Sequence, residues 1–90
     1  MELSMYYVYV LQSKKDKDFY TGFTSDLNRR IEEHNKGHQV STKHRVPLEL
    51  IYYEWCLSKE DVLSREKYLK SGRGKKYLKD RLKHHFEDLD

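Results

Sequence analysis

The chain has 90 residues, of which 37% are hydrophobic and 37% charged, and its mean hydropathy is -1.02. This length allows one domain, because independent domains mostly run from about 50 to 200 residues. No apolar run approaches the roughly 18 residues that span a bilayer, and twelve aromatic residues argue against disorder. The N-terminus lacks the pattern of a signal peptide, and a single cysteine excludes an internal disulfide or a zinc cage. We expect one cytoplasmic domain over residues 1–90, without a membrane partner.

Positive charge is concentrated near the C-terminus. The formal net charge is only +3, yet residues 65–85 hold nine Lys and Arg against two acidic residues. Such a density is an electrostatic footprint for polyanions, including nucleic acids. A solvated helix face is the alternative explanation for the same residues.

The first half of the chain has the pattern of a hairpin followed by a helix. Two runs are rich in β-branched and aromatic side chains, as strands are, and a polar turn joins them. N-cap side chains come next, and Gly37 favours the left-handed conformation that ends many helices. The elements predicted here are strands at residues 5–11 and 19–23, a helix from residues 24–26 to Lys36, and a loop at residues 38–47.

The second half predicts one strand and two helices. Leu48 to Trp55 forms the third strand, and the bulky residues on both of its faces place it at the centre of the sheet. Ser58 begins a segment that resembles a capping box. The remaining elements are a helix to about Lys70, a break at Ser71, Gly72 and Gly74, and a last helix over about residues 75–85. The order ββαβαα with antiparallel strands is an α+β arrangement.

One carboxylate interrupts an apolar stripe. Helical projection places Glu66 in the middle of the stripe formed by Val62, Leu63 and Leu69. A carboxylate on a core-facing line is costly unless it is paired or bound to a cation. An i,i+4 pair with Lys70 is the structural explanation, and metal binding is the functional one.

The first helix and the hairpin contribute further polar groups to the same interior. Arg30 and His34 project onto the side of the helix that Leu27 marks as buried. Alternation along the first strand puts Tyr9 on the opposite face from Val8 and Val10, so that Tyr9 and Tyr20 can lie near each other across the hairpin. These residues also have structural explanations: a side chain lying along the surface, or a tyrosine that only packs.

Together these positions provide two phenols, a guanidinium, an imidazole and a carboxylate. Acyl transfer requires a Ser or Cys nucleophile with a base, which this set lacks. An Arg and a metal held by a carboxylate stabilise charge on a phosphate, while a phenol helps to activate water. The set therefore suits hydrolysis of a phosphodiester.

Three segments resemble the GIY-YIG nuclease domain family. Tyr7-Val8-Tyr9, a spacer of ten residues and then Tyr20-Thr21-Gly22 resemble its paired signature. The segment from Asp26 to His34 is similar to the family's helix, which carries an Arg and, four residues later, a His. Tyr7 stands where the first signature has Gly, and Thr21 where the second has Ile; neither change replaces a catalytic side chain.

Later segments resemble the small stand-alone bacterial subgroup of that family: Ser41-Thr42, residues 45–54 and residues 65–72. The resemblance covers roughly residues 5–78, the expected domain core, and leaves residues 79–90 as a basic and acidic tail. It implies a three-stranded antiparallel sheet flanked by helices. It also implies divalent-metal-dependent DNA cleavage, usually with one Mg²⁺, or with Mn²⁺ in its place.

Carried over residue by residue, the resemblance assigns catalytic roles to Tyr9, Tyr20, Arg30, His34 and Glu66, with Glu66 as the metal ligand. Larger members take specificity from an attached DNA-binding domain, and this chain has no segment of that kind. We therefore expect a DNA endonuclease of low intrinsic sequence specificity, with DNA repair or recombination as its setting.

Nucleic-acid contacts are expected from the basic segment and from the loop before the third strand. The residues assigned to them are Thr42, Lys43, Lys70, Arg73, Lys75, Lys76 and Lys79. DNA is the expected partner, and RNA is not excluded. Two other classes of protein fit the same residues: a non-catalytic nucleic-acid-binding module that uses the same basic cleft, and an interaction protein whose aromatic surface meets another protein.

Overall fold

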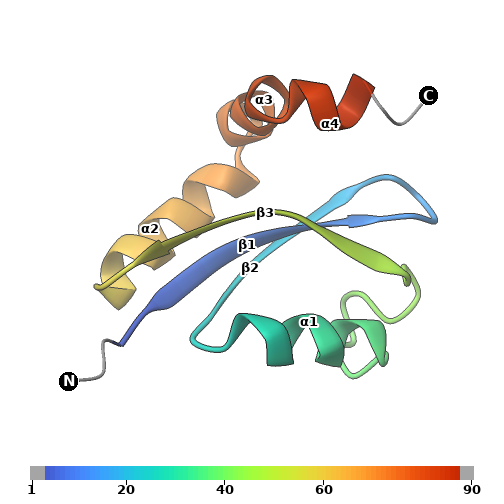
Figure 1. The fold of residues 1–90 in the computed structure, drawn as a ribbon, viewed down its shortest axis with the longest axis horizontal. Helices are drawn as coiled ribbons and strands as arrows, with labels where there is room; N and C mark the ends of the chain where they lie inside the picture. Colours follow the sequence, from blue (N-terminus) through green and yellow to red (C-terminus); the bar gives the residue numbers. More distant parts are fainter. Residues whose placement is uncertain (1–3, 88–90) are drawn as a thin grey trace.

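The computed structural model describes residues 4–87. The elements in chain order are β1 (Tyr6–Ser13), β2 (Phe19–Thr24), α1 (Leu27–Asn35), β3 (Leu48–Cys56), α2 (Lys59–Lys70), α3 (Gly72–Arg81) and α4 (Lys83–Glu87). The strands form one antiparallel sheet, with α1 on one side and α2 to α4 on the other (Figure 1). This is the predicted α+β fold. Within the described residues, no helix is long and apolar enough to cross a membrane.

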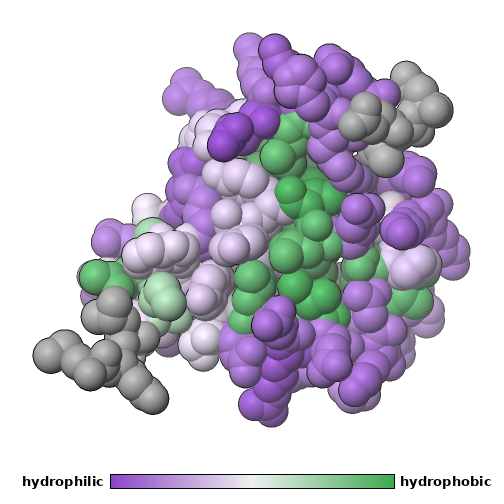
Figure 2. All heavy atoms as spheres, viewed as in Figure 1, coloured by the Kyte–Doolittle hydropathy of each residue, from purple (hydrophilic) through white to green (hydrophobic). Residues whose placement is uncertain are grey.

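The central strand is β1, so the predicted central position of β3 is wrong. The strand order is β2-β1-β3, and every residue from Val8 to Ser13 is buried. On β3, Tyr53 and Trp55 are 50% and 52% exposed. Bulky residues on both faces do not require a central position, because an edge strand can leave large aromatic rings half in solvent. Figure 2, with β3 on its near side, shows hydrophobic residues along the middle of this face and hydrophilic residues around them.

The two faces of the sheet carry separate cores. Alternation along β1 sends Val8 and Val10 to one face and Tyr9 and Leu11 to the other, as predicted. The first core adds Val62 and Leu69 from α2 and Leu78 from α3; the second adds Leu48, with Leu27 and Ile31 from α1 packed against it. Tyr9 therefore belongs to the layer between the sheet and α1.

The buried stripe of α2 is narrower than predicted. Val62 and Leu69 are buried, whereas Leu63 is 37% exposed because it lies about 100° around the helix from Val62. The Glu66 side chain is only 18% exposed, and its carboxylate lies 3.8 Å from the Lys70 amine. The predicted i,i+4 pair is therefore present. Ser58 is the N-cap residue, as predicted, but its side chain makes no capping hydrogen bond.

The junction between α2 and α3 differs from the predicted break. Ser71 alone separates the two helices, and its hydroxyl oxygen accepts a hydrogen bond from the Gly74 amide at 3.1 Å. Gly72 and Gly74 lie in the first turn of α3, so they begin a helix instead of interrupting one. The predicted helix over residues 75–85 is in fact the end of α3 and most of α4, because Leu82 leaves helical geometry at φ −110° and ψ 26°.

Gly74 permits a close approach between the backbones of α2 and α3. A Cβ atom at residue 74 would overlap the carbonyl oxygen of Tyr68 and the backbone of Leu69, whereas one at Gly72 would meet nothing within 4 Å. We expect Gly74→Ala to lower the free energy of unfolding by about 1–3 kcal/mol or more, through overpacking against immobile backbone. Gly72→Ala is the matched control and is expected to be neutral or stabilising by up to about 1 kcal/mol. Urea denaturation measures both, and equal effects would contradict the close approach.

Candidate active site

Gly22 makes room for the Tyr9 ring across the hairpin. The register pairs Tyr9 with Gly22, and a Cβ atom at residue 22 would lie 2.5 Å from the Tyr9 hydroxyl oxygen. A hydrogen at this position therefore lets the phenol lie across β2. The Tyr20 ring is adjacent, with its centroid 6.4 Å from that of Tyr9, so the predicted proximity of the two tyrosines is confirmed.

Side-chain hydrogen bonds cap the N-terminus of α1 and attach its C-terminus to the sheet. At the N-terminus, the Asp26 carboxylate accepts a hydrogen bond from the Arg29 amide at 3.2 Å, which confirms a predicted N-cap residue. At the C-terminus, the Asn35 side chain accepts from the Leu48 amide at 2.8 Å and donates to the Leu48 carbonyl at 3.0 Å. This pair of hydrogen bonds ties the end of α1 to the start of β3, directly beside His34.

His34 joins the hairpin to the loop after α1. It is fully buried, and its Nε2 lies 2.9 Å from the Tyr9 hydroxyl oxygen. Its Nδ1 lies 2.7 Å from the hydroxyl oxygen of Thr42. The Tyr20 ring packs edge-on against the imidazole, with ring centroids 5.0 Å apart. Tyr9, Tyr20 and His34 thus form one cluster, and Thr42 closes it from the loop.

Thr42 is not available for the DNA contact that the sequence assigns to it. Its side chain is fully buried and hydrogen bonded to His34, so that assignment is wrong. The reason is the path of the loop after α1, which brings residue 42 against the buried imidazole of His34. A Thr in a segment without periodicity gives no sequence signal of such a contact.

The two hydroxyls that contact His34 are linked to its tautomer. Tyr9 and Thr42 are both buried with His34 as their side-chain partner within residues 4–87, so one hydroxyl donates to the neutral imidazole and the other accepts from it. When Thr42 donates to Nδ1, the imidazole proton resides on Nε2, which donates to the oxygen of Tyr9. An oxygen that accepts this bond is better able to carry negative charge, and its own proton stays free to leave.

Burial controls the protonation of this cluster. Desolvation is the largest cause that raises the pKa of Tyr9 to about 12; the charge of Tyr20 raises it further, and that of Arg30 lowers it. Desolvation also lowers the pKa of His34, as does the positive charge of Arg30. His34 is therefore neutral near pH 7, consistent with a hydrogen-bonding partner for Tyr9 in place of a second cation.

Arg30 and Glu66 are the other two residues that the sequence assigns to the site. Both act electrostatically on the Tyr9 phenol, which Arg30 stabilises and Glu66 destabilises in its ionised form. The Arg30 side chain is 36% exposed and its guanidinium lies 3.7 Å from the Glu33 carboxylate. It thus extends from the buried cluster toward solvent.

The donor atoms of this site suit a hard divalent cation. Within the described residues there is no group of three or more His, Cys, Asp and Glu that would hold a metal ion alone. Both His34 nitrogens are already engaged, by Tyr9 and by Thr42, so the Glu66 carboxylate is the group that would hold a cation, as predicted from the sequence. Mg²⁺ is commonly bound through one or two carboxylates plus substrate phosphate oxygens. The residues fit Mg²⁺ or Mn²⁺ better than Zn²⁺, which prefers nitrogen and sulfur ligands.

The basic residues predicted to contact DNA divide into two groups. Lys70, Lys75 and Lys79 line connected hollows that begin at Tyr20 and continue along α3. Lys43, Arg73 and Lys76 are exposed but lie outside those three hollows. Their roles stay predictions.

This α+β domain, in which Tyr9, Tyr20 and His34 are in contact and Arg30 and Glu66 act electrostatically on Tyr9, matches known proteins. The model of the GIY-YIG catalytic domain matches residues 5–78. The chain therefore belongs to the GIY-YIG family of nuclease domains, as its sequence signature indicates.

Individual relatives are small proteins of similar length. Over 67 residues the chain is 43% identical to a UPF0213 protein of Clostridium perfringens, covering 73% of this chain and 71% of that protein. Over 65 residues it is 45% identical to a UPF0213 protein of Streptococcus pyogenes, covering 71% and 70%. Among solved structures it resembles the solution NMR structure of the UPF0213 protein BH0048 of Bacillus halodurans, with a TM-score of 0.52 and 38% identity over 82% of this chain and 81% of that one.

Proposed function

We propose that the protein is a metal-dependent endonuclease that hydrolyses phosphodiester bonds of DNA with low intrinsic sequence specificity. The observation that carries this proposal is the buried chain of hydrogen bonds from Thr42 through His34 to Tyr9, a phenol on which Arg30 and Glu66 both act electrostatically. Membership of a nuclease family supports it.

Each side chain then has a distinct task. Arg30 contacts the scissile phosphate and stabilises the charge that develops on it. Tyr9 accepts the proton of the attacking water, and the His34 Nε2–H and the Arg30 guanidinium offset part of the burial that raises its pKa to about 12. Tyr20, which is partly exposed beside His34, orients water or phosphate. Glu66 would hold the divalent cation, whose contribution when bound is to polarise the phosphate as a Lewis acid.

A binding module without turnover is the competing function. It would use the exposed lysines of α3, which serve binding whether or not cleavage follows. It would have no use for a phenol, an imidazole and a hydroxyl aligned by hydrogen bonds in the interior, an arrangement that is costly to bury unless every partner is satisfied. This alignment favours the enzyme.

A plasmid-nicking assay tests the proposal. Supercoiled DNA is incubated with the full chain in Mg²⁺, in Mn²⁺ and in EDTA, and the open circular form is quantified. We expect nicking with either metal and none in EDTA. Binding of the plasmid without nicking under all three conditions would favour the binding module.

Thr42 provides a separate test of the hydrogen-bonded chain. Thr42→Val keeps the shape of the side chain but removes its hydroxyl, leaving His34 Nδ1 without a partner, at a cost of about 1–3 kcal/mol in the free energy of unfolding. We also expect slower cleavage at every pH, since the tautomer of His34 is no longer fixed. Thr42→Ser retains the hydroxyl and should restore the rate. A Thr42→Val enzyme with the wild-type rate would mean that Thr42 serves stability alone.

A further inference from the structure

Three hollows join end to end between the catalytic cluster and α4, and we call them together the basic groove. The first, of about 200 Å³, is lined by Tyr20, Lys70 and Lys75, and the second, of about 420 Å³, by Lys75 and Lys79. The third, of about 520 Å³, extends from Lys79 to α4. Phe19 lines all three, Lys75 lines the first two and Lys79 the last two, so neighbouring hollows share a wall beside α3.

The basic groove carries more positive charge than the whole chain. Six cationic residues line it against two acidic ones, Asp18 and Glu87, while the net charge of the chain is +3. Arg45 is engaged by Asp16 at 2.9 Å, and Lys70 by Glu66. The other four cations, Lys17, Lys75, Lys79 and Lys83, form no ion pair with any residue of the described part of the chain. A line of uncompensated amines is complementary to a chain of phosphates.

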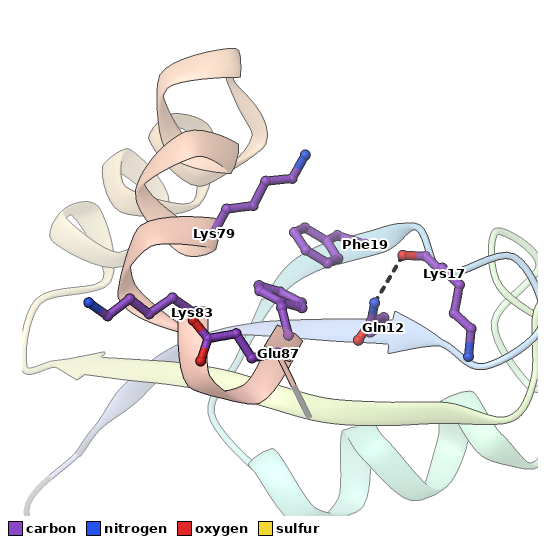
Figure 3. Close-up of a pocket in the computed structure, with 7 residues that line it drawn as sticks. Gln12, Lys17, Phe19, Lys79, Lys83 and Glu87 are labelled. Atoms are coloured by element: carbon purple, nitrogen blue, oxygen red, sulfur yellow. Dashed lines mark hydrogen bonds between the residues drawn. The ribbon is translucent and has the colours of Figure 1, made fainter. Parts of the chain in front are cut away.

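The far end of the groove has an aromatic wall. The rings of Phe19 and Phe86 stack with centroids 5.7 Å apart and planes 20° from parallel, and both line the third hollow. Figure 3 shows Lys79 extending from α3 over Phe19, with Lys17 and Lys83 at the two sides. Gln12 lies below and donates a hydrogen bond to the Lys17 carbonyl at 3.2 Å. The groove thus combines amines, ring faces and an amide.

We propose that the basic groove holds an unpaired nucleic-acid strand, with its phosphates along Lys75 and Lys79 and a base against the Phe19–Phe86 wall. This inference rests on the proposed nuclease function and specifies its substrate: a single strand, or a duplex with a single-stranded arm leading to the cleavage point. Proteins that bind single strands combine a basic track with aromatic rings on which bases stack. In a duplex the base faces are hidden by their neighbours, so a duplex would use the amines but not the wall.

Binding measurements separate the contribution of the amines from that of the Phe19–Phe86 wall. They are made in EDTA, so that no metal is present to support cleavage. The probes are a fluorescent oligothymidine, the same backbone with abasic sites, and a duplex hairpin of equal charge. We expect the oligothymidine to bind more tightly than the hairpin, and its abasic counterpart about 5- to 100-fold more weakly, as stacked bases typically contribute. Equal affinity for the normal and abasic strands, or a preference for the duplex, would overturn the proposal.

Variants locate the binding in the groove. Lys79→Ala with Lys83→Ala should weaken oligothymidine binding and reduce the log–log salt slope by about 0.7 for each phosphate that is no longer neutralised. Lys67→Ala with Arg81→Ala changes the net charge equally at exposed positions outside the groove, and should leave the slope nearly unchanged. Phe86→Leu keeps an apolar contact with Phe19 and should abolish the difference between normal and abasic strands. Equal slopes for the two double variants would place the strand elsewhere.

Cleavage distinguishes failure of this inference from failure of the nuclease function. Circular single-stranded DNA and nicked or supercoiled duplex circles are incubated with Mg²⁺. Groove-dependent binding of single strands without cleavage of any circle would support the groove and refute the nuclease. If the Lys79→Ala, Lys83→Ala variant cleaves duplex circles at the wild-type rate, the proposed role of the groove is refuted and the nuclease function is still supported.

Discussion

Glu66→Gln is expected to abolish metal-dependent cleavage while leaving the fold and DNA binding intact. The amide preserves the shape of the side chain but loses the charge that would hold a divalent cation. The loss should exceed the 10- to 100-fold typical of removing a group that only supports a metal ligand. The ion pair with Lys70 is largely exposed on the lysine side, so its removal should change the free energy of unfolding by less than about 1 kcal/mol.

Nicking rates across a range of Mg²⁺ concentrations measure this effect. Glu60→Gln is the matched control, because it makes the same change at an exposed position of the same helix. Glu60→Gln should cleave like the wild type, and thermal melts should show both variants folded. A wild-type cleavage rate for Glu66→Gln would show that Glu66 is not the metal ligand.

Tyr9→Phe is expected to lower the cleavage rate by about 10²–10⁴-fold, the usual contribution of a general base. Tyr20→Phe should cost less, because its hydroxyl only positions water or phosphate. The two variants should also differ in stability. The Tyr9 hydroxyl is buried against His34, so its removal leaves Nε2 unpaired and costs about 1–3 kcal/mol, whereas Tyr20 is partly exposed.

The pH dependence of nicking gives this comparison its sharpest readout. Burial raises the pKa of Tyr9 to about 12. In the free enzyme, the fraction of Tyr9 that is ionised therefore increases with pH throughout the neutral range. The wild-type rate should therefore increase with pH, and Tyr9→Phe should lose that increase while Tyr20→Phe keeps it. If Tyr9→Phe retains both its rate and its slope, the base is elsewhere, and His34 is the next candidate.

The sequence predicts elements whose pattern is local. Period-two alternation separates Val8 from Tyr9 correctly, and the spacing of Arg30 and His34 brings both to the buried side of α1. Strand order is not a local property: β1 and β3 both carry bulky residues on two faces, and only their pairing decides that β1 lies between its neighbours. Similarly, the role of Gly74 depends on the backbone of the preceding helix.

The candidate site shows the same limit. The five assigned residues come from motifs with fixed spacing, so a resemblance identifies them. Thr42 and Asn35 act on partners in other elements: Thr42 reaches His34 from a loop without periodicity, and Asn35 reaches Leu48 across that loop. Such contacts depend on the path of the chain after α1. Their sequence signal is only that a Thr and an Asn occur at these positions, which is too common to be informative.

The contacts of Arg65 determine the direction in which the next residue, Glu66, points. Its guanidinium lies 2.8 Å from the Glu54 carboxylate on β3 and stacks on the rings of Tyr68 and Tyr77, at 4.8 and 4.9 Å from their centroids. Consecutive residues of a helix point about 100° apart. The contacts of Arg65 with Glu54 on β3 and Tyr77 on α3 therefore fix the rotation of α2 about its own axis. That rotation decides where Glu66 points. The direction of the carboxylate that we propose as the metal ligand is thus set from the edge of the sheet farthest from β2, by a residue to which we assign no part in the reaction.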